Sequence, residues 1–383
     1  MNKIIAPKKL LGILIALAVM IAFFSSSATA SNKKLRFRPD GTFKIVQFTD
    51  TQDDQDIDPR TVELIEKVLD TENPDLVVFT GDNIAGGPGN GGIRTLEDLQ
   101  KAIDNIAAPV DSRHIPWLIT FGNHDAERAA ITNVDEPGML KIYRSYPYNI
   151  NQVGPKGVNG TGNMNALIYN STGRLPVFNI WALDSGRYAP DSIAGQNISN
   201  DALLGWGWMP TWDWLQQSQV QWYATTSQGL EKSYGRKIPS LMFFHIPLQE
   251  FRQMYENGSN HDVTGERNED ECPGPFNSGM FAALLERKDV RGVFVGHDHV
   301  NDYVGNYFGI MLGYSASTGF GTYGLGGDDN HRMRGARVFS IYYEDNPQID
   351  THMVFAKDLG ISIVAATAEE RAPLIGSGPR ANK

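Results

Sequence analysis

The chain of 383 residues has a single cysteine, Cys272, so it cannot form an internal disulfide bond. It also lacks any block of basic residues, since 34 lysines and arginines are set against 44 acidic residues and the formal net charge is -10. Such a chain is poorly suited to bind nucleic acid, because that binding depends on neutralising phosphates. Beyond residue 24, no apolar run approaches the roughly 20 residues that span a bilayer. We therefore expect neither a nucleic-acid partner nor a membrane span in the body of the chain.

The first thirty residues have the pattern of a secretory signal peptide. Three lysines (Lys3, Lys8 and Lys9) precede the apolar run 10–24, and Ala28-Thr29-Ala30 forms a small-x-small cleavage site. An uncleaved anchor is the alternative, but the run of fifteen residues is short for a span. We expect a signal peptide at 1–30, the functional domain at 31–372 and a loose tail at 373–383. The mature protein is then exported, to a periplasmic or extracellular location, and has no membrane span.

The rest of the chain alternates short apolar runs with helical patterns. Apolar runs that are rich in β-branched and aromatic residues predict buried strands at 43–48, 76–80, 117–121, 177–183, 240–244 and 293–295. Helical spacing predicts helices at 59–73, 96–106 and 278–288. This alternation is typical of a layered α/β fold with a largely covered sheet. The last apolar runs, 308–314 and 337–344, lack a clear helix between them and predict an antiparallel edge.

Polar residues that can bind metals follow five of these apolar runs directly. They are Asp50 and Gln52, Asp82, the group Asn123-His124-Asp125, His245, and the pair His297 and His299. In open α/β sheets, ligands bind at the carboxyl ends of the strands, so these side chains are expected along one rim. Mixed carboxylate, amide and imidazole ligation suits two divalent first-row ions that share a carboxylate.

Taken one at a time, these residues have a simpler explanation, because Gly-Asp and Gly-Asn pairs are common turns. The combination is far less common. With eight histidines and 39 glycines in the chain, chance predicts roughly 0.02 occurrences of Gly-His-x-His. Here that pattern stands beside Gly-Asn-His-Asp, Gly-Asp and Asp-x-Gln, each after an apolar run. A metal site therefore explains the set better than turn formation does.

At these positions the sequence resembles the calcineurin-like metallophosphoesterases, which carry D-x-H, G-D, G-N-H-[DE], a lone histidine and G-H-x-H in this order. The resemblance covers about 43–324 and is nearest to the branch of Dcr2-like phosphatases and the plant purple acid phosphatases of type 29. Shared segments include FTDTQD, LDSG, WLQQSQVQWY and FNSGMFAALLER before VFVGHDH. It implies a four-layer α/β/β/α sandwich with metals at the carboxyl ends of the strands.

The resemblance also implies the roles of the individual residues. A first metal takes Asp50, Gln52, Asp82 and His299, and a second takes Asp82, Asn123, His245 and His297, so that Asp82 bridges the two. His124 faces the substrate as an acid for the leaving group or as an electrostatic stabiliser, with Asp125 orienting its ring. The chemistry agrees: a water between two cations becomes a bridging hydroxide near neutral pH, and a positioned histidine can supply a proton. The implied activity is hydrolysis of phosphate esters, as a phosphatase or phosphodiesterase, with manganese, iron or zinc as the metals.

Gln52 is the one departure from the family pattern, which has histidine there. An amide oxygen is uncharged and binds borderline metals less well than imidazole does. This leaves three hypotheses: an exported dinuclear phosphoesterase, a catalytically weak relative that binds phosphate esters or metals, and a non-enzymatic surface protein. The third hypothesis gives no role to the predicted metal ligands.

Overall fold

The computed structural model of the protein describes residues 34–85, 92–198, 211–258, 261–343 and 347–365. The predicted signal peptide at 1–30 and the predicted tail at 373–383 lie outside these residues. Among the described residues, no helix has the length and apolar character that crossing a membrane requires.

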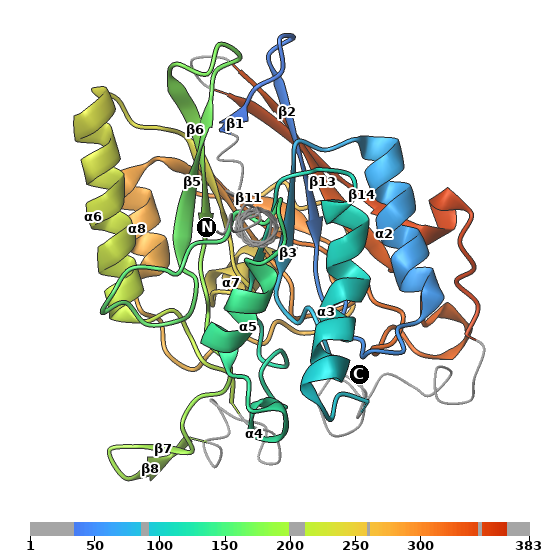
Figure 1. Cartoon of the computed structure of the whole chain (residues 1–383). Helices are drawn as coiled ribbons and strands as arrows, with labels where there is room; N and C mark the ends of the chain where they lie inside the picture. Colours follow the sequence, from blue (N-terminus) through green and yellow to red (C-terminus); the bar gives the residue numbers. More distant parts are fainter. Residues whose placement is uncertain (1–33, 86–91, 199–210, 259–260, 344–346, 366–383) are drawn as a thin grey trace, which may run out of the picture. The chain divides into compact units, whose positions relative to one another are not determined.

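Two sheets form the centre of the described part (Figure 1). The five-stranded sheet has the spatial order β14 (Gln348–Phe355), β13 (Gly335–Tyr342), β2 (Thr42–Phe48), β3 (Leu76–Thr80) and β4 (Trp117–Thr120). The seven-stranded sheet has the order β1 (Leu35–Arg36), β5 (Met164–Tyr169), β6 (Pro176–Ala182), β9 (Ser240–Phe243), β10 (Val290–Val295), β12 (Ile310–Tyr314) and β11 (Val304–Tyr307). A separate small hairpin joins β7 (Ser192–Ile193) to β8 (Gln196–Asn197).

The two sheets pack face to face through an apolar core. Because side chains alternate along a strand, Phe43 and Ile45 of β2 face the other sheet, whereas Val46 and Phe48 face away from it. Phe339 of β13 contacts β10 across this interface, with its ring centroid 4.5 Å from that of Phe294. Burial of these rings on both faces fixes the distance between the sheets.

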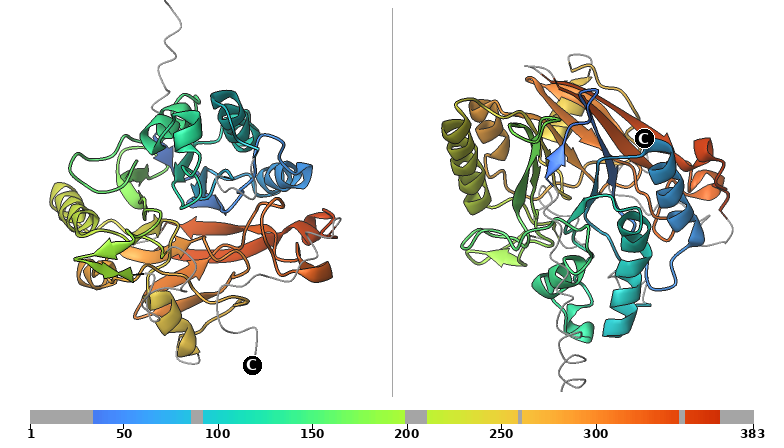
Figure 2. Two further views of the ribbon diagram at one scale, coloured as in Figure 1. Left: turned by 90° about the horizontal axis from the view of Figure 1, so that it is seen from below. Right: turned by 45° about the horizontal axis from the view of Figure 1, so that its top comes forward.

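Helices cover the outer face of each sheet (Figures 1 and 2). The five-stranded sheet is covered by α2 (Pro59–Glu72), α3 (Leu96–Asp111) and α5 (Glu136–Tyr143), and the seven-stranded sheet by α6 (Gln217–Tyr234), α7 (Glu250–Glu256) and α8 (Met280–Arg287). The short helices α4 (Ala129–Thr132) and η4 (Ala356–Leu359) pack against the same apolar core as α2, α3 and α5. Helix α2 begins where Asp58 accepts a hydrogen bond from the Arg60 amide and Pro59 occupies the first turn. The four-layer α/β/β/α sandwich is thus confirmed.

The predicted strands and helices are present, with ends shifted by a few residues, but the expected antiparallel edge is wrong. The run 337–344 forms β13, which lies inside the five-stranded sheet between β2 and β14. The run 308–314 forms β12 of the other sheet, parallel to β10 and antiparallel to β11. The antiparallel edge strands on these sides of the two sheets are instead β14, next to β13, and β11, next to β12. The exposed residues that alternate along β14 gave no strong apolar signal.

Candidate metal centre

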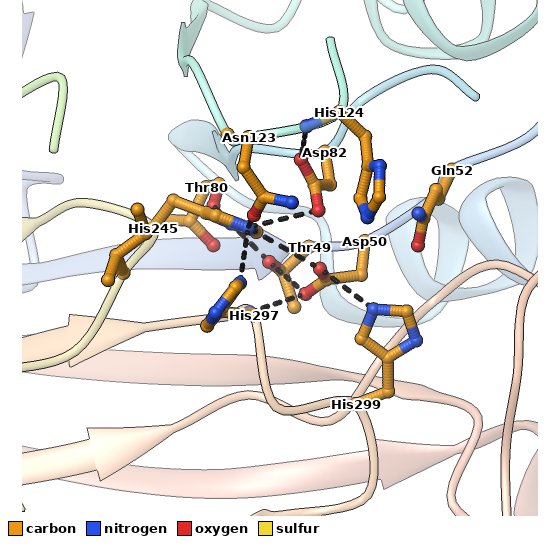
Figure 3. A network of polar contacts seen from close by, with 12 residues as sticks. Thr49, Asp50, Gln52, Thr80, Asp82, Asn123, His124, His245, His297 and His299 are labelled. Carbon is orange, nitrogen blue, oxygen red and sulfur yellow. Dashed lines mark hydrogen bonds and ion pairs between the residues drawn. The ribbon is translucent and has the colours of Figure 1, made fainter. Parts of the chain in front are cut away.

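Both sheets contribute to one group of polar side chains (Figure 3). The parallel strands β2, β3 and β4 are followed by Asp50, Gln52, Asp82 and Asn123, and the parallel strands β9 and β10 are followed by His245, His297 and His299. Six of these residues form one buried cluster, and none of them is more than 7% exposed. The cluster consists of Asp50, Asp82, Asn123, His245, His297 and His299. The rim predicted from the sequence is therefore present, although it is built from two sheets rather than one.

The backbone is unusual at these strand ends. Asp50, Asp82 and His297 have φ values of 48°, 48° and 77°, in the left-handed region that residues with a side chain rarely adopt. Each such residue costs of order 1–3 kcal/mol, and such strain persists where the surrounding structure holds it. In this case it turns the side chain of each strand-end residue toward the cluster.

Glycine precedes two of these residues, Asp82 and His297, for a steric reason. Gly81 has a φ of 88°, and a Cβ atom there would lie 2.7 Å from the ring of His245. A Cβ atom on Gly296 would lie 2.6 Å from Oδ2 of Asp50. The Gly-Asp and Gly-His pairs of the sequence thus allow loops from different strands to approach closely.

One half of the cluster is centred on His245. Its Nε2 atom lies 3.1 Å from Oδ2 of Asp82 and 3.2 Å from Oδ1 of Asn123. Nδ1 of His297 is 3.3 Å from the same nitrogen. Asp82, His245 and His297 together form a candidate ligand group in which the ligand atoms all lie within 4.8 Å of one another.

The other half is centred on Asp50. Its Oδ1 atom is buried and lies 3.2 Å from Nε2 of His299, and no hydrogen bond to it is formed within the described part of the chain. Asp50, Asp82 and His299 form a second candidate ligand group, again with ligand atoms within 4.8 Å of one another. Asp82 belongs to both groups, so a single carboxylate joins the two halves.

The electrostatics of the cluster fit a cation. Burial lowers the pKa of His245, but the carboxylates of Asp82 and Asp50 outweigh burial and raise it to about 10. Burial raises the pKa of Asp82, but His245 and His124 hold it well below its usual range. Burial and His245 lower the pKa of His297, which keeps that imidazole in the neutral form that binds metals. The buried carboxylates thus stabilise positive charge on the neighbouring ring, and a divalent cation would be stabilised at the same place.

The surrounding groups fix the orientation of the ligands. Nδ1 of His245 lies 2.9 Å from the carbonyl oxygen of Thr80, and this contact orients the ring with Nε2 toward the cluster. Oδ2 of Asp50 accepts hydrogen bonds from Oγ1 of Thr49 at 2.7 Å and from the amide of His297 at 3.1 Å. Its other oxygen is thereby aimed at the cluster.

Gln52 lies beside the cluster, and its amide has a different partner. Oε1 of Gln52 accepts a hydrogen bond of 2.8 Å from Oγ1 of Thr322, and Gln52 is 6% exposed. The same hydroxyl lies 3.4 Å from Nδ1 of His299. In Figure 3, no contact is drawn between Gln52 and the other labelled residues. Gln52 thus reaches His299 through Thr322, and its predicted role as a ligand stays a prediction.

His124 stands at the edge of the cluster with its side chain 31% exposed. Its amide donates a 2.7 Å hydrogen bond to Oδ1 of Asp82, and its Nδ1 lies 3.1 Å from Oε2 of Glu127. Burial lowers the pKa of His124, but Asp82 and Glu127 raise it overall. Tyr188 donates a short hydrogen bond to the other oxygen of Glu127. The ring is therefore charged more readily than a free histidine.

Asp125 does not have the position expected from the sequence. Its Oδ1 accepts from the amide of Asn83 at 2.9 Å, and its Oδ2 accepts from the amide of Gly122 at 2.8 Å. Asp125 thus ties together the loops after β3 and β4, and the carboxylate beside the His124 ring is Glu127. Asp125 was predicted as the partner of this ring because it directly follows His124 in the sequence. Only the turn at 124–127, where the amide of Glu127 bonds to the carbonyl of His124, brings Glu127 back to the ring.

The fold and the site together define a class of metallophosphoesterase-type proteins, and the comparison of sequences names the family. Residues 43–301 match the family model described as calcineurin-like phosphoesterase, so the chain belongs to that family. This match confirms the resemblance that the sequence indicated.

Individual relatives show which members of this family the chain is similar to. The chain is 33% identical to "Probable inactive purple acid phosphatase 29" of Arabidopsis thaliana over 331 residues, which cover 78% of each protein. It is 33% identical to "Probable inactive purple acid phosphatase 14" of the same plant over 76% of this chain and 74% of the relative. It is 30% identical to "Phosphatase DCR2" of Saccharomyces cerevisiae over 71% of this chain and 46% of that protein. Among solved structures, a dimetal phosphatase from Danio rerio has the same fold, with a TM-score of 0.50, 15% identity and coverage of 82% and 99%.

Proposed function

We propose that this protein is an exported, metal-dependent phosphoesterase that hydrolyses phosphate esters with two divalent ions. The observation that carries this proposal is the pair of buried ligand groups that share Asp82. Two cations close to one carboxylate are the arrangement used for in-line displacement at phosphorus. Membership of the phosphoesterase family supports the same reaction class.

The ligands divide between the two ions as the family resemblance implies. The first ion is assigned Asp50, Gln52, Asp82 and His299, and the second Asp82, Asn123, His245 and His297. When bound, the ions supply an activated water and neutralise charge on the phosphoryl oxygens. Oxygen and imidazole donors without thiolate suit manganese, iron or zinc.

His124 is assigned the proton that the leaving group needs. Hydrolysis adds water to phosphorus and breaks the ester P–O bond, and the departing alkoxide must then take up a proton. Among the described residues, His124 is hydrogen-bonded to the cluster through its backbone amide, and its ring pairs with Glu127 at the edge of the cluster, where a substrate can reach it. Glu127 and Asp82 favour the protonated ring, which is the form that a general acid requires.

Export is part of the proposal and depends on the N-terminal pattern of lysines, apolar run and Ala-x-Ala site. The test is intact mass and N-terminal sequencing of protein recovered outside the cytoplasm. A mature protein that begins at Ser31 is expected. A chain recovered only in the cytoplasm or membrane, with residues 1–30 still attached, contradicts export.

A catalytically weak binding protein is the second candidate. Two relatives carry "Probable inactive" in their names, and the Gln52 amide already accepts a hydrogen bond from Thr322. In this case the protein binds the ions or a phosphate ester but turns over slowly.

One experiment separates the two candidates. The purified protein is loaded with manganese, iron or zinc, its metal content is measured, and its rates with nitrophenyl phosphate and bis(nitrophenyl) phosphate are compared with those of the Asp82→Asn variant. Two ions per chain and turnover that the variant loses support the phosphoesterase. Two ions without turnover support the binding protein. A chain that takes up no ions contradicts the phosphoesterase and also a protein that binds ions.

A further inference from the structure

A cleft of about 440 Å³ lies beside the candidate metal centre. Its walls come from the loop after β6, the segment before α6 and the start of α5, and include Tyr188, Trp214 and Glu136. Because β6 lies next to β9 in the seven-stranded sheet, the cleft continues the rim that carries His245. Its volume is in the range of sites for small molecules.

Two residues connect the cleft to the metal centre on the side of His124. Nε of Arg187 donates a 3.1 Å hydrogen bond to the carbonyl oxygen of Asn123. The hydroxyl of Tyr188 lies 3.4 Å from Nδ2 of Asn123 and also bonds to Glu127, the residue beside His124. An alcohol protonated by His124 would therefore leave toward this cleft.

The lining of the cleft excludes two kinds of leaving group. None of the described residues that line it has an aliphatic side chain, so an alkyl chain gains little there. Among the same residues, three acidic side chains, those of Glu136, Asp184 and Asp213, are set against a single cation, Arg187. Even without Glu136, whose pKa burial raises to about 8, two acidic groups remain for one cation. A leaving group with further phosphates meets this excess of negative charge.

The remaining polar groups fit hydroxyl groups better than an ammonium ion. Oδ1 and Oδ2 of Asp184 accept hydrogen bonds from the amides of Gly186 and Thr161, and Oδ1 of Asp213 accepts from that of Trp214. These carboxylates are thus partly neutralised, and burial raises the pKa of Asp184 to about 6 and that of Glu136 to about 8. Arg187 would repel an ammonium ion at the same place. A hydroxyl group can both donate to the carboxylates and accept from Arg187.

We propose that this cleft binds the leaving group of the substrate and that this group is a polyhydroxylated alcohol, as in a sugar or polyol phosphate. Asp213 and Arg187 bond to its hydroxyl groups, and Trp214 provides a flat apolar surface for its C–H face. The proposal rests on the proposed phosphoesterase function, because it assigns the alcohol side of that reaction.

The experiment compares three phosphomonoesters on the metal-loaded protein: glucose 6-phosphate, phosphocholine and hexyl phosphate. Nitrophenyl phosphate is the reference, because its good leaving group depends least on the cleft. We expect kcat/KM for glucose 6-phosphate to exceed those for the other two alkyl esters by roughly tenfold or more, about the effect of one or two hydrogen bonds. Equal values, or a preference for phosphocholine or hexyl phosphate, overturn the proposal.

Variants test the individual contacts. Asp213→Asn keeps the acceptor for the Trp214 amide but removes the charge, and Trp214→Ala removes the flat surface. Each is expected to lower kcat/KM for glucose 6-phosphate by roughly tenfold. Asp213→Asn is also expected to leave kcat/KM for nitrophenyl phosphate within about threefold, because the nitrophenyl ring has no hydroxyl group to donate to Asp213. The matched controls are Asp350→Asn and Phe308→Ala, on exposed residues of β14 and of the turn after β11. An equal loss with both esters in Asp213→Asn overturns the proposal, because it indicates a general structural defect.

A binding measurement keeps this test separate from that of the proposed function. Calorimetry with glucose 6-phosphate is made on the metal-loaded wild type, Asp213→Asn and Trp214→Ala. If both variants weaken the binding of glucose 6-phosphate, the cleft proposal is supported. This holds even if nitrophenyl phosphate is not hydrolysed, because the absence of hydrolysis would contradict only the proposed activity. Binding that neither variant changes overturns the cleft proposal whatever the activity is.

Discussion

The two halves of the candidate metal centre differ in how firmly their side chains are held. Around His245, three possible ligand atoms lie 3.1 to 3.3 Å from one ring nitrogen, and the Thr80 carbonyl fixes the other nitrogen at 2.9 Å. Around His299, the second ring nitrogen has longer contacts to the described residues, 3.3 Å to the carbonyl of Tyr323 and 3.4 Å to Thr322. The Gln52 amide of this half is bound to Thr322. We infer that the two ions are held unequally, with the ion at the His299 half exchanging first.

Asp82→Ala is expected to have the largest effect, because it removes a ligand from both halves at once. We expect loss of at least one ion and a fall in turnover of at least about 10³-fold, since the remaining cations lose the carboxylate between them. Metal analysis and rates with nitrophenyl phosphate are the measurements, and circular dichroism reports the fold. Asp350→Ala, on the exposed face of β14, is the matched control. Full metal content and an unchanged rate in Asp82→Ala would contradict the shared role.

His124→Ala is expected to leave both halves intact and to act on the chemical step alone. Turnover of an alkyl phosphate should fall roughly 10²–10⁴-fold, the usual range for a general acid. The loss should be smaller with nitrophenyl phosphate, because nitrophenolate departs without a proton. His352→Ala, on an exposed position of β14, is the control. Loss of metal from His124→Ala would make His124 a ligand instead.

Variants of Gln52 test the weaker half directly. Gln52→His should tighten binding of zinc or iron at that half, and Gln52→Ala should weaken it, because imidazole is a better donor than an amide for these ions. Calorimetric titration and elemental analysis after mild chelation give the affinity of the ion that is lost first. If the three forms have identical affinities, Gln52 is not a ligand.

Thr322→Val is expected to have the smallest effect, confined to the His299 half. The substitution keeps the shape of the side chain but removes the hydroxyl between Gln52 and His299. Loss of such a supporting contact typically lowers metal affinity about 10–100-fold. Thr172→Val, which removes an exposed hydroxyl bonded to Asn170, is the control. An equal loss of both ions from Thr322→Val would contradict the inequality of the two halves.

The sequence predicted the parts of the protein that depend on local chemistry. Short apolar runs located the inner strands, and the polar residues after them located the cluster, because a parallel strand delivers its next residues to the rim. The partner of His124 was assigned to Asp125, yet Glu127 holds that place through a tight turn. The contact from Thr322 to Gln52 joins positions 270 residues apart. Such contacts depend on how loops cross in space, and no local pattern encodes them. For the same reason, the edge strand β14, with its alternating exposed residues, was not recognised.

The origin of the ligands has a consequence for folding stability. Asp50, Asp82 and Asn123 extend from the five-stranded sheet, whereas His245, His297 and His299 extend from the seven-stranded sheet. Ions bound between them would therefore fasten the two layers together, in a chain whose single cysteine allows no internal disulfide. At a free-ion concentration 100 times the dissociation constant, one site adds about 2.7 kcal/mol to the free energy of unfolding. Metal supply would then decide how long the protein stays folded, as well as whether it turns over substrate.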